Sequence, residues 1–332
     1  MKRHLLLLAL LSATAYARTP EGPLGPFRTP NDGRPVIATP GGQFEILVER
    51  QGEIAIESGD ELIALQTEWG TAFQGGIRGR CTLPATVPEG PQALVLTLNT
   101  ETDRNARALF VVPAIPDQYA IACISAPGSA DPKTKASSEN RFQALNKSPA
   151  SFALIFATDQ GDGFGKLLSD LSEYTKPTFV VPVAEPAVVR AWFGPATFDF
   201  TFGKEAFAVP ALGRSGLGDS SGDAVNDFAR MTSALQPGRW AVCVMPHFET
   251  GISMRNELTL FVDRPFDVVL CGPGGAGAEK PPKDLAWTGW FAPIPVYAVS
   301  SGQSVQLEVT RKSEQPYKVV PLAGTAPPVA SR

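Results

Sequence analysis

The first half of the chain alternates between apolar and polar positions over short stretches, with glycine, aspartate and asparagine between them. The apolar runs cover residues 44–48, 54–56, 62–65, 93–98 and 108–112. Alternation with a period of two predicts strands with one buried face. No helical periodicity interrupts these runs. We therefore expect an antiparallel β-sandwich of the immunoglobulin-like type over residues 43–116, preceded by a Pro/Gly-rich arm at 18–42.

The second half combines longer apolar runs with segments of helical spacing. Strands are predicted at 119–124, 152–156, 179–183, 207–209, 240–245, 268–271 and 296–300, and helices at 139–147, 164–174 and 223–235. In the second helix Phe164, Leu167 and Leu171 recur at offsets of three and four, which gives it one apolar face. This alternation predicts an α/β domain over residues 117–310 whose functional loops follow the strands, with a tail at 311–332.

Residues 1–17 have the pattern of a secretory signal peptide. A basic start at Lys2 and Arg3 precedes an apolar run, and Ala15-Tyr16-Ala17 supplies a small-x-small cleavage site. The apolar run is shorter than the roughly 20 residues that cross a bilayer, and no other segment comes close to that length. We therefore expect an exported protein without a membrane span, in the periplasm, the cell envelope or the medium.

Composition limits the classes of partner and the size of the fold. At 332 residues, 43% of them hydrophobic, the chain is long enough for about two domains. Without Lys2 and Arg3 the 29 basic residues fall to 27, against 33 acidic ones. This balance argues against nucleic acid or an anionic membrane as the main partner. The four cysteines lack the close spacing of a zinc or redox motif. Cys123, Cys243 and Cys271 lie in or beside apolar runs, so we expect them to be buried small hydrophobic residues.

Five strand-plus-loop motifs resemble those of the calcineurin-like metallophosphoesterases, in the same order. They cover residues 121–128, 154–160, 179–186, 242–247 and 267–275, and a strand pair at 198–203 and 207–209 stands between the third and fourth. The resemblance spans residues 117–302. It implies a four-layer α-β-β-α sandwich, and the secreted members of the family include proteins with a β-sandwich in front. It also implies a pair of metal ions that bind the phosphate and activate a water.

The positions of the family's metal ligands carry other residues in this chain. The ligand positions of the first motif fall on Ala126 and Gly128, and those of the third on Ala184 and Glu185. The ligand position of the fourth motif falls on Pro246, beside His247, and those of the fifth fall on Pro273 and Gly275. The second motif keeps Asp159, the one family ligand in place. Without the leader, His247 is also the last histidine of the chain, so no alignment supplies more than one imidazole. The sequence therefore predicts a degenerate site without catalytic residues and without the dinuclear metal cofactor.

Weaker alternatives stay open at the same loops. Asp159 and Asp162 could offer oxygen ligands to a hard cation, with Glu185 of the next motif as a third ligand. A turn that caps the following helix is the plainer interpretation of residues 159–163. The cluster Trp287, Trp290 and Phe291 suits either an interface anchor or a core. The main hypothesis is a non-catalytic binding or cell-envelope protein with an unknown protein or envelope ligand. The rival hypothesis is an active phosphoesterase or other hydrolase with a metal site rebuilt around Asp159.

Overall fold

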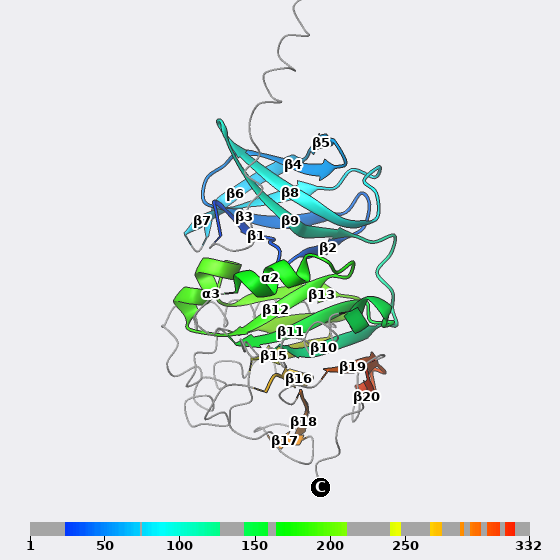
Figure 1. The fold of residues 1–332 in the computed structure, drawn as a ribbon. Coiled ribbons are helices and arrows are strands. Elements are labelled where there is room, and N and C mark those ends of the chain that lie inside the picture. Colours follow the sequence, from blue (N-terminus) through cyan, green and yellow to red (C-terminus); the bar gives the residue numbers. More distant parts are fainter. Residues whose placement is uncertain are drawn as a thin grey trace, which may run out of the picture. The chain divides into compact units, whose positions relative to one another are not determined.

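The chain divides into two compact units, seen in a computed structural model (Figure 1). The structure describes residues 24–73, 75–126, 143–158, 164–210, 240–246, 266–273, 286–288, 293–299, 304–312 and 316–322. The first unit, here the N-terminal unit, comprises Met1–Ala114 together with Gly165–Ser172. The C-terminal unit comprises Ile115–Phe164 and Glu173–Arg332. Residues 1–17, where the sequence predicts a leader, lie outside the described ranges.

Two sheets form the N-terminal unit. The four-stranded sheet has the order β1 (Phe27–Thr29), β3 (Gln43–Val48), β7 (Gly76–Thr82) and β6 (Gln66–Phe73). The five-stranded sheet has the order β2 (Val36–Ala38), β9 (Glu101–Val111), β8 (Gly90–Leu98), β4 (Glu53–Ser58) and β5 (Glu61–Ala64). All neighbours are antiparallel except β2 and β9. Every strand predicted for this half is present.

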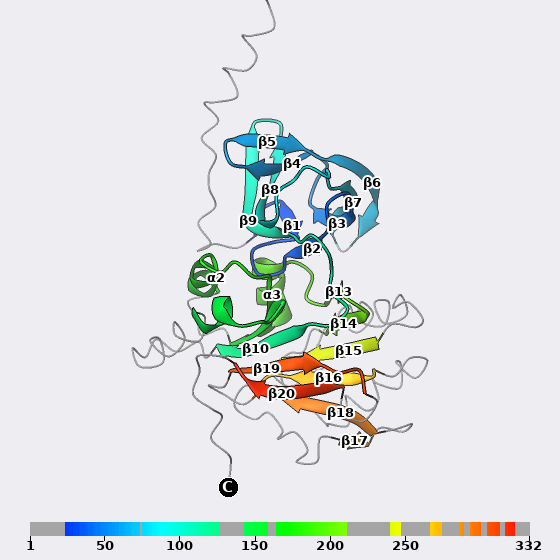
Figure 2. The same cartoon turned by 90° about the vertical axis from the view of Figure 1, so that its right-hand side faces the viewer.

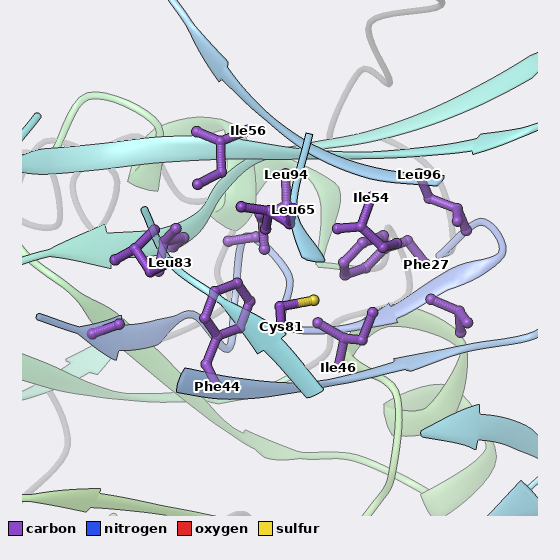
Figure 3. Close-up of a cluster of buried hydrophobic side chains, with 14 of the residues drawn as sticks. Phe27, Phe44, Ile46, Ile54, Ile56, Leu65, Cys81, Leu83, Leu94 and Leu96 are labelled. Carbon is purple, nitrogen blue, oxygen red and sulfur yellow. The ribbon is translucent and has the colours of Figure 1, made fainter. Parts of the chain in front are cut away.

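One apolar core lies between these two sheets (Figure 3). Phe44 and Ile46 of β3 and Cys81 of β7 point toward Ile54, Leu94 and Leu96 of the other sheet. These side chains occupy alternate positions of their strands, which is the reason why the alternation in the sequence could locate them. Each fully buried aliphatic or phenylalanine side chain stabilises the unit by about 1.5–3 kcal/mol.

The C-terminal unit contains two sheets, each of which combines parallel and antiparallel strands (Figure 2). The five-stranded sheet has the order β12 (Thr178–Val183), β11 (Phe152–Thr158), β10 (Ala120–Ala126), β19 (Ser304–Val309) and β20 (Tyr317–Pro321). The six-stranded sheet has the order β13 (Phe198–Phe202), β14 (Glu205–Val209), β15 (Trp240–Met245), β16 (Val268–Cys271), β18 (Pro293–Ala298) and β17 (Ala286–Thr288). Strands β10 to β12 are parallel, as are β14, β15, β16 and β18.

Aromatic side chains join these two sheets. The ring of Phe152 on β11 lies 5.7 Å from that of Phe200 and 5.4 Å from that of Phe207, which belong to the six-stranded sheet. Phe200 also stacks on Phe179 of β12, with 3.9 Å between ring centroids. The contact between the sheets is therefore an aromatic core, in which edge-on and offset arrangements of the rings contribute beyond simple burial.

The predicted α-β-β-α architecture is wrong. The described residues form twenty strands in four sheets, and their helices are short: a turn at 143–147, α2 (Gly165–Leu171) and α3 (Pro186–Phe193). The helix expected at 223–235 lies outside the described residues. Apolar runs such as β12, buried at all six positions, do require cover on both faces. That requirement does not say whether a helix or a second sheet supplies the cover, and the prediction assigned it to helices.

Candidate site at the strand ends of the C-terminal unit

The predicted pocket residues follow strands whose carboxyl ends are aligned within each sheet. In the five-stranded sheet Ala126 pairs with Ala157, and the next residue along β11, Thr158, pairs with Val183. In the six-stranded sheet Cys271 pairs with both Met245 and Ala298. Functional loops gather at such edges of parallel sheets. The described candidates Ala126, Ala184 and Pro246 therefore end or directly follow strands at these edges.

A glycine brings the two edges into contact. Gly272 follows β16, and its N–H donates to the carbonyl oxygen of Met245 at 3.0 Å. A Cβ atom at Gly272 would lie 2.5 Å from Cδ1 of Phe156, on the other sheet, and 2.6 Å from the carbonyl oxygen of Pro246. Both distances are shorter than any van der Waals contact, so this approach requires glycine. Phe156 is buried, and apolar packing therefore fills the space between the strand ends here.

The described residues at this edge do not fit a dinuclear metal centre. Ala126, Ala184, Pro246 and Pro273 have no side-chain donor atoms that bind a metal, and Glu185 is the one carboxylate among the described candidates. Glu185 is exposed and precedes α3 without a side-chain capping bond. Across the described ranges, no group of three or more His, Cys, Asp or Glu residues is arranged to hold a metal ion. Two metal ions need a shell of imidazoles and carboxylates that these positions do not offer.

Several predicted residues are outside the described ranges. They are Gly128, Asp159, Asp162, His247, Gly275, Trp290 and Phe291. Trp287 lies on β17 opposite Ile294 of β18, and its backbone alone is described. The hypotheses of a cation loop at Asp159 and of an aromatic interface anchor therefore stay predictions.

A charged cluster that the sequence did not predict lies at the opposite edge of the same unit. Glu205, the first residue of β14, is 1% exposed. Its carboxylate accepts a hydrogen bond from the Tyr119 hydroxyl at 2.6 Å and from Nε of Arg311 at 2.8 Å. Nη2 of Arg311 and the backbone N–H of Lys204 also donate to it, at 3.3 and 3.2 Å. Four donors therefore satisfy this buried charge, as burial of a carboxylate demands.

The cluster ties the two sheets together at the amino ends of β10 and β14. Tyr119 immediately precedes β10, and Arg311 follows β19, which is antiparallel to β10. Burial raises the pKa of Tyr119 far above its ordinary value, and the nearby negative charge of Glu205 adds to this effect. The hydrogen bonds to Glu205 raise the pKa of Arg311. Arg311 also has a φ of +54°, uncommon for a residue with a side chain. Because the carboxylate is closed off from solvent, this arrangement is a structural tie.

Three buried thiols lie in the strands of the C-terminal unit. Cys123 of β10, Cys243 of β15 and Cys271 of β16 are each 0% exposed and free, as is Cys81 of the N-terminal unit. Burial raises the pKa of Cys123 and Cys243, and raises that of Cys271 to about 12. Thiols that stay protonated are poor nucleophiles and metal ligands. The prediction of buried small hydrophobic residues is confirmed for Cys123, Cys243 and Cys271, and Cys81 is buried as well.

Comparisons with known proteins add no family. No family model and no curated protein matches the chain. Among solved structures it is similar to amylomaltase from Corynebacterium glutamicum, at 19% identity over 46% of this chain and 23% of that one, with a TM-score of 0.21. It is also similar to a carbohydrate acetylesterase from Xanthomonas citri, at 12% identity over 78% of this chain and 62% of that one, with a TM-score of 0.27.

Likenesses this weak support no statement about fold or function. The chain also spans less than two thirds of the length of either protein. Neither protein is a metallophosphoesterase, and the resemblance to that family stays a prediction from motif order. In the described part of the chain, no helix is long and apolar enough to cross a membrane.

Proposed function

We propose that this chain is an exported, non-catalytic binding protein. The observation that supports this most directly is the chemistry of the strand ends in the C-terminal unit. At the edge where functional loops of parallel sheets gather, the described candidate positions carry alanine or proline except for the exposed Glu185, and Gly272 packs against Phe156. A hydrolase needs polar groups converging on a reacting atom, which this packing does not provide.

The buried charges of the same unit support the proposal as well. Glu205 and Arg311 neutralise each other at the opposite edge, with Glu205 closed off from solvent. Among the described residues of this unit, the buried ion pair that would ordinarily suggest chemistry is therefore occupied in holding the two sheets together. Export is proposed on the leader pattern of residues 1–17, and the partner is an unknown protein or envelope ligand.

Metal content of the purified mature protein tests this proposal. The protein would be incubated with manganese, iron, zinc and calcium, freed of loose ions and analysed by mass spectrometry, and hydrolysis of a phosphomonoester would be measured on the same sample. We expect almost no retained metal and no turnover. Retention of about two transition-metal ions per chain, with turnover, would overturn the proposal in favour of a rebuilt site. In that case Asp159→Asn should abolish both retention and turnover.

A further inference from the structure

The open edges of the N-terminal unit differ in length. Strands β1, β2 and β5 are edge strands of three, three and four residues. Very short edge strands present few unpaired backbone groups, which is a common way to prevent unwanted pairing. Strand β6 is an edge strand of eight residues and pairs with β7 alone among the described strands. It is therefore the longest edge strand among the described strands of this unit (Figure 2).

The sequence of β6 carries little of the usual protection. It contains no lysine and no proline, and Glu68 is its one charged residue. The strand has an irregular register between Trp69 and Ala72, but the pairing with β7 is regular over Gln66–Trp69. Gln66 and Glu68 are exposed. In an antiparallel pair every second residue of an edge strand directs its N–H and C=O away from its partner. Residues 66–69 thus offer free hydrogen-bonding groups to an added strand.

The two faces of β6 differ in chemistry. Glu68 lies opposite Arg80 of β7, yet Arg80 forms its ion pair with Glu45 of β3, at 3.9 Å. No ion pair of Glu68 is found among the described residues. On the other face, Trp69 is half-buried and packs against the core of the sandwich, as does Ile63 of β5. An added strand would therefore meet, on one face, a carboxylate with no ion pair among the described residues, and on the other face an apolar surface.

We propose that the open edge of β6 binds an extended peptide that alternates basic and apolar side chains, adding it as a fifth strand to the sheet. Residues directly opposite each other in a sheet share a face. A lysine or arginine opposite Glu68 pairs with its carboxylate, and the apolar residues on either side of it extend the core beside Trp69. Backbone bonds give affinity and alternate side chains give specificity in such strand addition.

A second copy of the chain suits this edge less well than a basic peptide does. Pairing of β6 with another β6 brings a strand whose only charge is again Glu68, so no cation reaches the carboxylate. Like charges close together across a sheet are destabilising. The acidic balance of the whole chain, 33 acidic against 29 basic residues, also favours a basic partner. This proposal concerns the N-terminal unit and is independent of the one made for the strand ends.

The test uses the full mature chain and a fluorescein-labelled probe peptide, acetyl-Lys-Val-Lys-Val-Lys-Val-Lys-amide. We expect saturable binding by fluorescence anisotropy, together with slower hydrogen exchange at 66–69 in the bound state. Glu68→Lys should weaken binding by about tenfold or more, because it places like charges together. The matched control is Glu61→Lys on β5, an exposed glutamate on the edge of the other sheet, which should leave the affinity within about twofold.

Two further probes separate strand addition from simple charge attraction. A peptide of the same sequence in which every residue is N-methylated keeps its charges but has no backbone donors on either edge, and it should fail to bind. The glutamate-for-lysine peptide should also fail. Undiminished binding of the N-methylated peptide, equal effects of Glu68→Lys and Glu61→Lys, or no binding of the lysine probe would each overturn the proposal. A dimer in light scattering that Glu68→Lys dissociates would overturn it in favour of self-pairing.

Discussion

Replacing Arg311 by methionine should strongly destabilise the C-terminal unit. The substitution removes the cation that pairs with Glu205, whose side chain is 2% exposed, whereas that of Arg311 is 16% exposed. Removing one partner of a buried ion pair costs about 3–5 kcal/mol, since the other charge stays buried and unpaired. Because Arg311 keeps some contact with solvent, water can reach part of the gap. We therefore expect a loss near the lower limit, about 3 kcal/mol.

Tyr119→Phe should cost less. The ring stays in place and keeps its edge-on contact with Phe202, with centroids 4.7 Å apart. What is lost is the hydroxyl bond to the carboxylate, and a hydrogen bond to a charged group contributes about 1.5–3 kcal/mol. Glu205 still has Arg311 as its counter-ion. The double variant should be less destabilised than the two losses added together, because both residues act on the same carboxylate.

Hydrogen exchange followed by mass spectrometry measures these losses, because it reports the opening free energy of β14 and β19 separately from the N-terminal unit. The matched control is Lys318→Met, which removes the pair between Lys318 and Glu308 (3.1 Å), whose side chains are 65% and 43% exposed. Exposed pairs contribute at most about 1 kcal/mol. If Arg311→Met costs no more than Lys318→Met, the view of Glu205 as the tie between the sheets is refuted.

Three further predictions concern the thiols and the strand ends. Because burial raises the thiol pKa values above the ordinary 9.0, the free energy of unfolding should be constant below pH 9 and fall above it. Between pH 9 and about 12, Cys271→Val should make this fall less steep by about 1.4 kcal/mol per pH unit, as measured by urea unfolding. Ellman's reagent should find no reactive thiol in the native protein and four after denaturation, whereas fewer than four would reveal a disulfide. Gly272→Ala should lower the free energy of unfolding by about 1–3 kcal/mol, because the added Cβ overpacks against Phe156 and Pro246. The control Gly70→Ala should be nearly neutral, because its Cβ would meet its nearest atom at 3.6 Å. Equal shifts of the melting temperature for the two variants would contradict the close approach at Gly272.

Many strands were predicted where the side chains show burial in the local pattern, although β19 (Ser304–Val309), whose apolar residues alternate, was missed. The alternation in β3, β4 and β8 and the continuous apolar runs of β10 to β12 are examples. Strands β6 and β7 were missed, because glycine, threonine and arginine interrupt their pattern. The short strand β20, within the segment assigned to the tail, gives a similarly weak signal. Helix α3 was missed although Glu185-Pro186 before Val189 and Phe193 is a recognisable helix start.

The candidate site shows the same division between local and distant information. Ala126, Ala184 and Pro246 end or directly follow strands that the local pattern predicts, so their position at strand ends needs no distant information. The pairing of Glu205 with Arg311 joins residues 106 positions apart. A glutamate after Gly203-Lys204 in a hairpin is ordinarily exposed. The residues next to it in the sequence do not indicate which distant arginine it pairs with. Tertiary pairing of this kind has no local signal.

The two edges of the C-terminal unit are built in opposite ways, and this bears on where recognition can occur. At the amino ends of β10 and β14 a buried charge holds the sheets together, and at the carboxyl ends of β11 and β16 apolar packing does so. Either device works only while its groups stay closed off from water, so neither is free to bind a polar ligand without opening the unit. Binding that leaves this unit folded therefore requires groups that are already exposed and unsatisfied. In the N-terminal unit, the carboxylate of Glu68 and the open backbone of β6 meet that requirement.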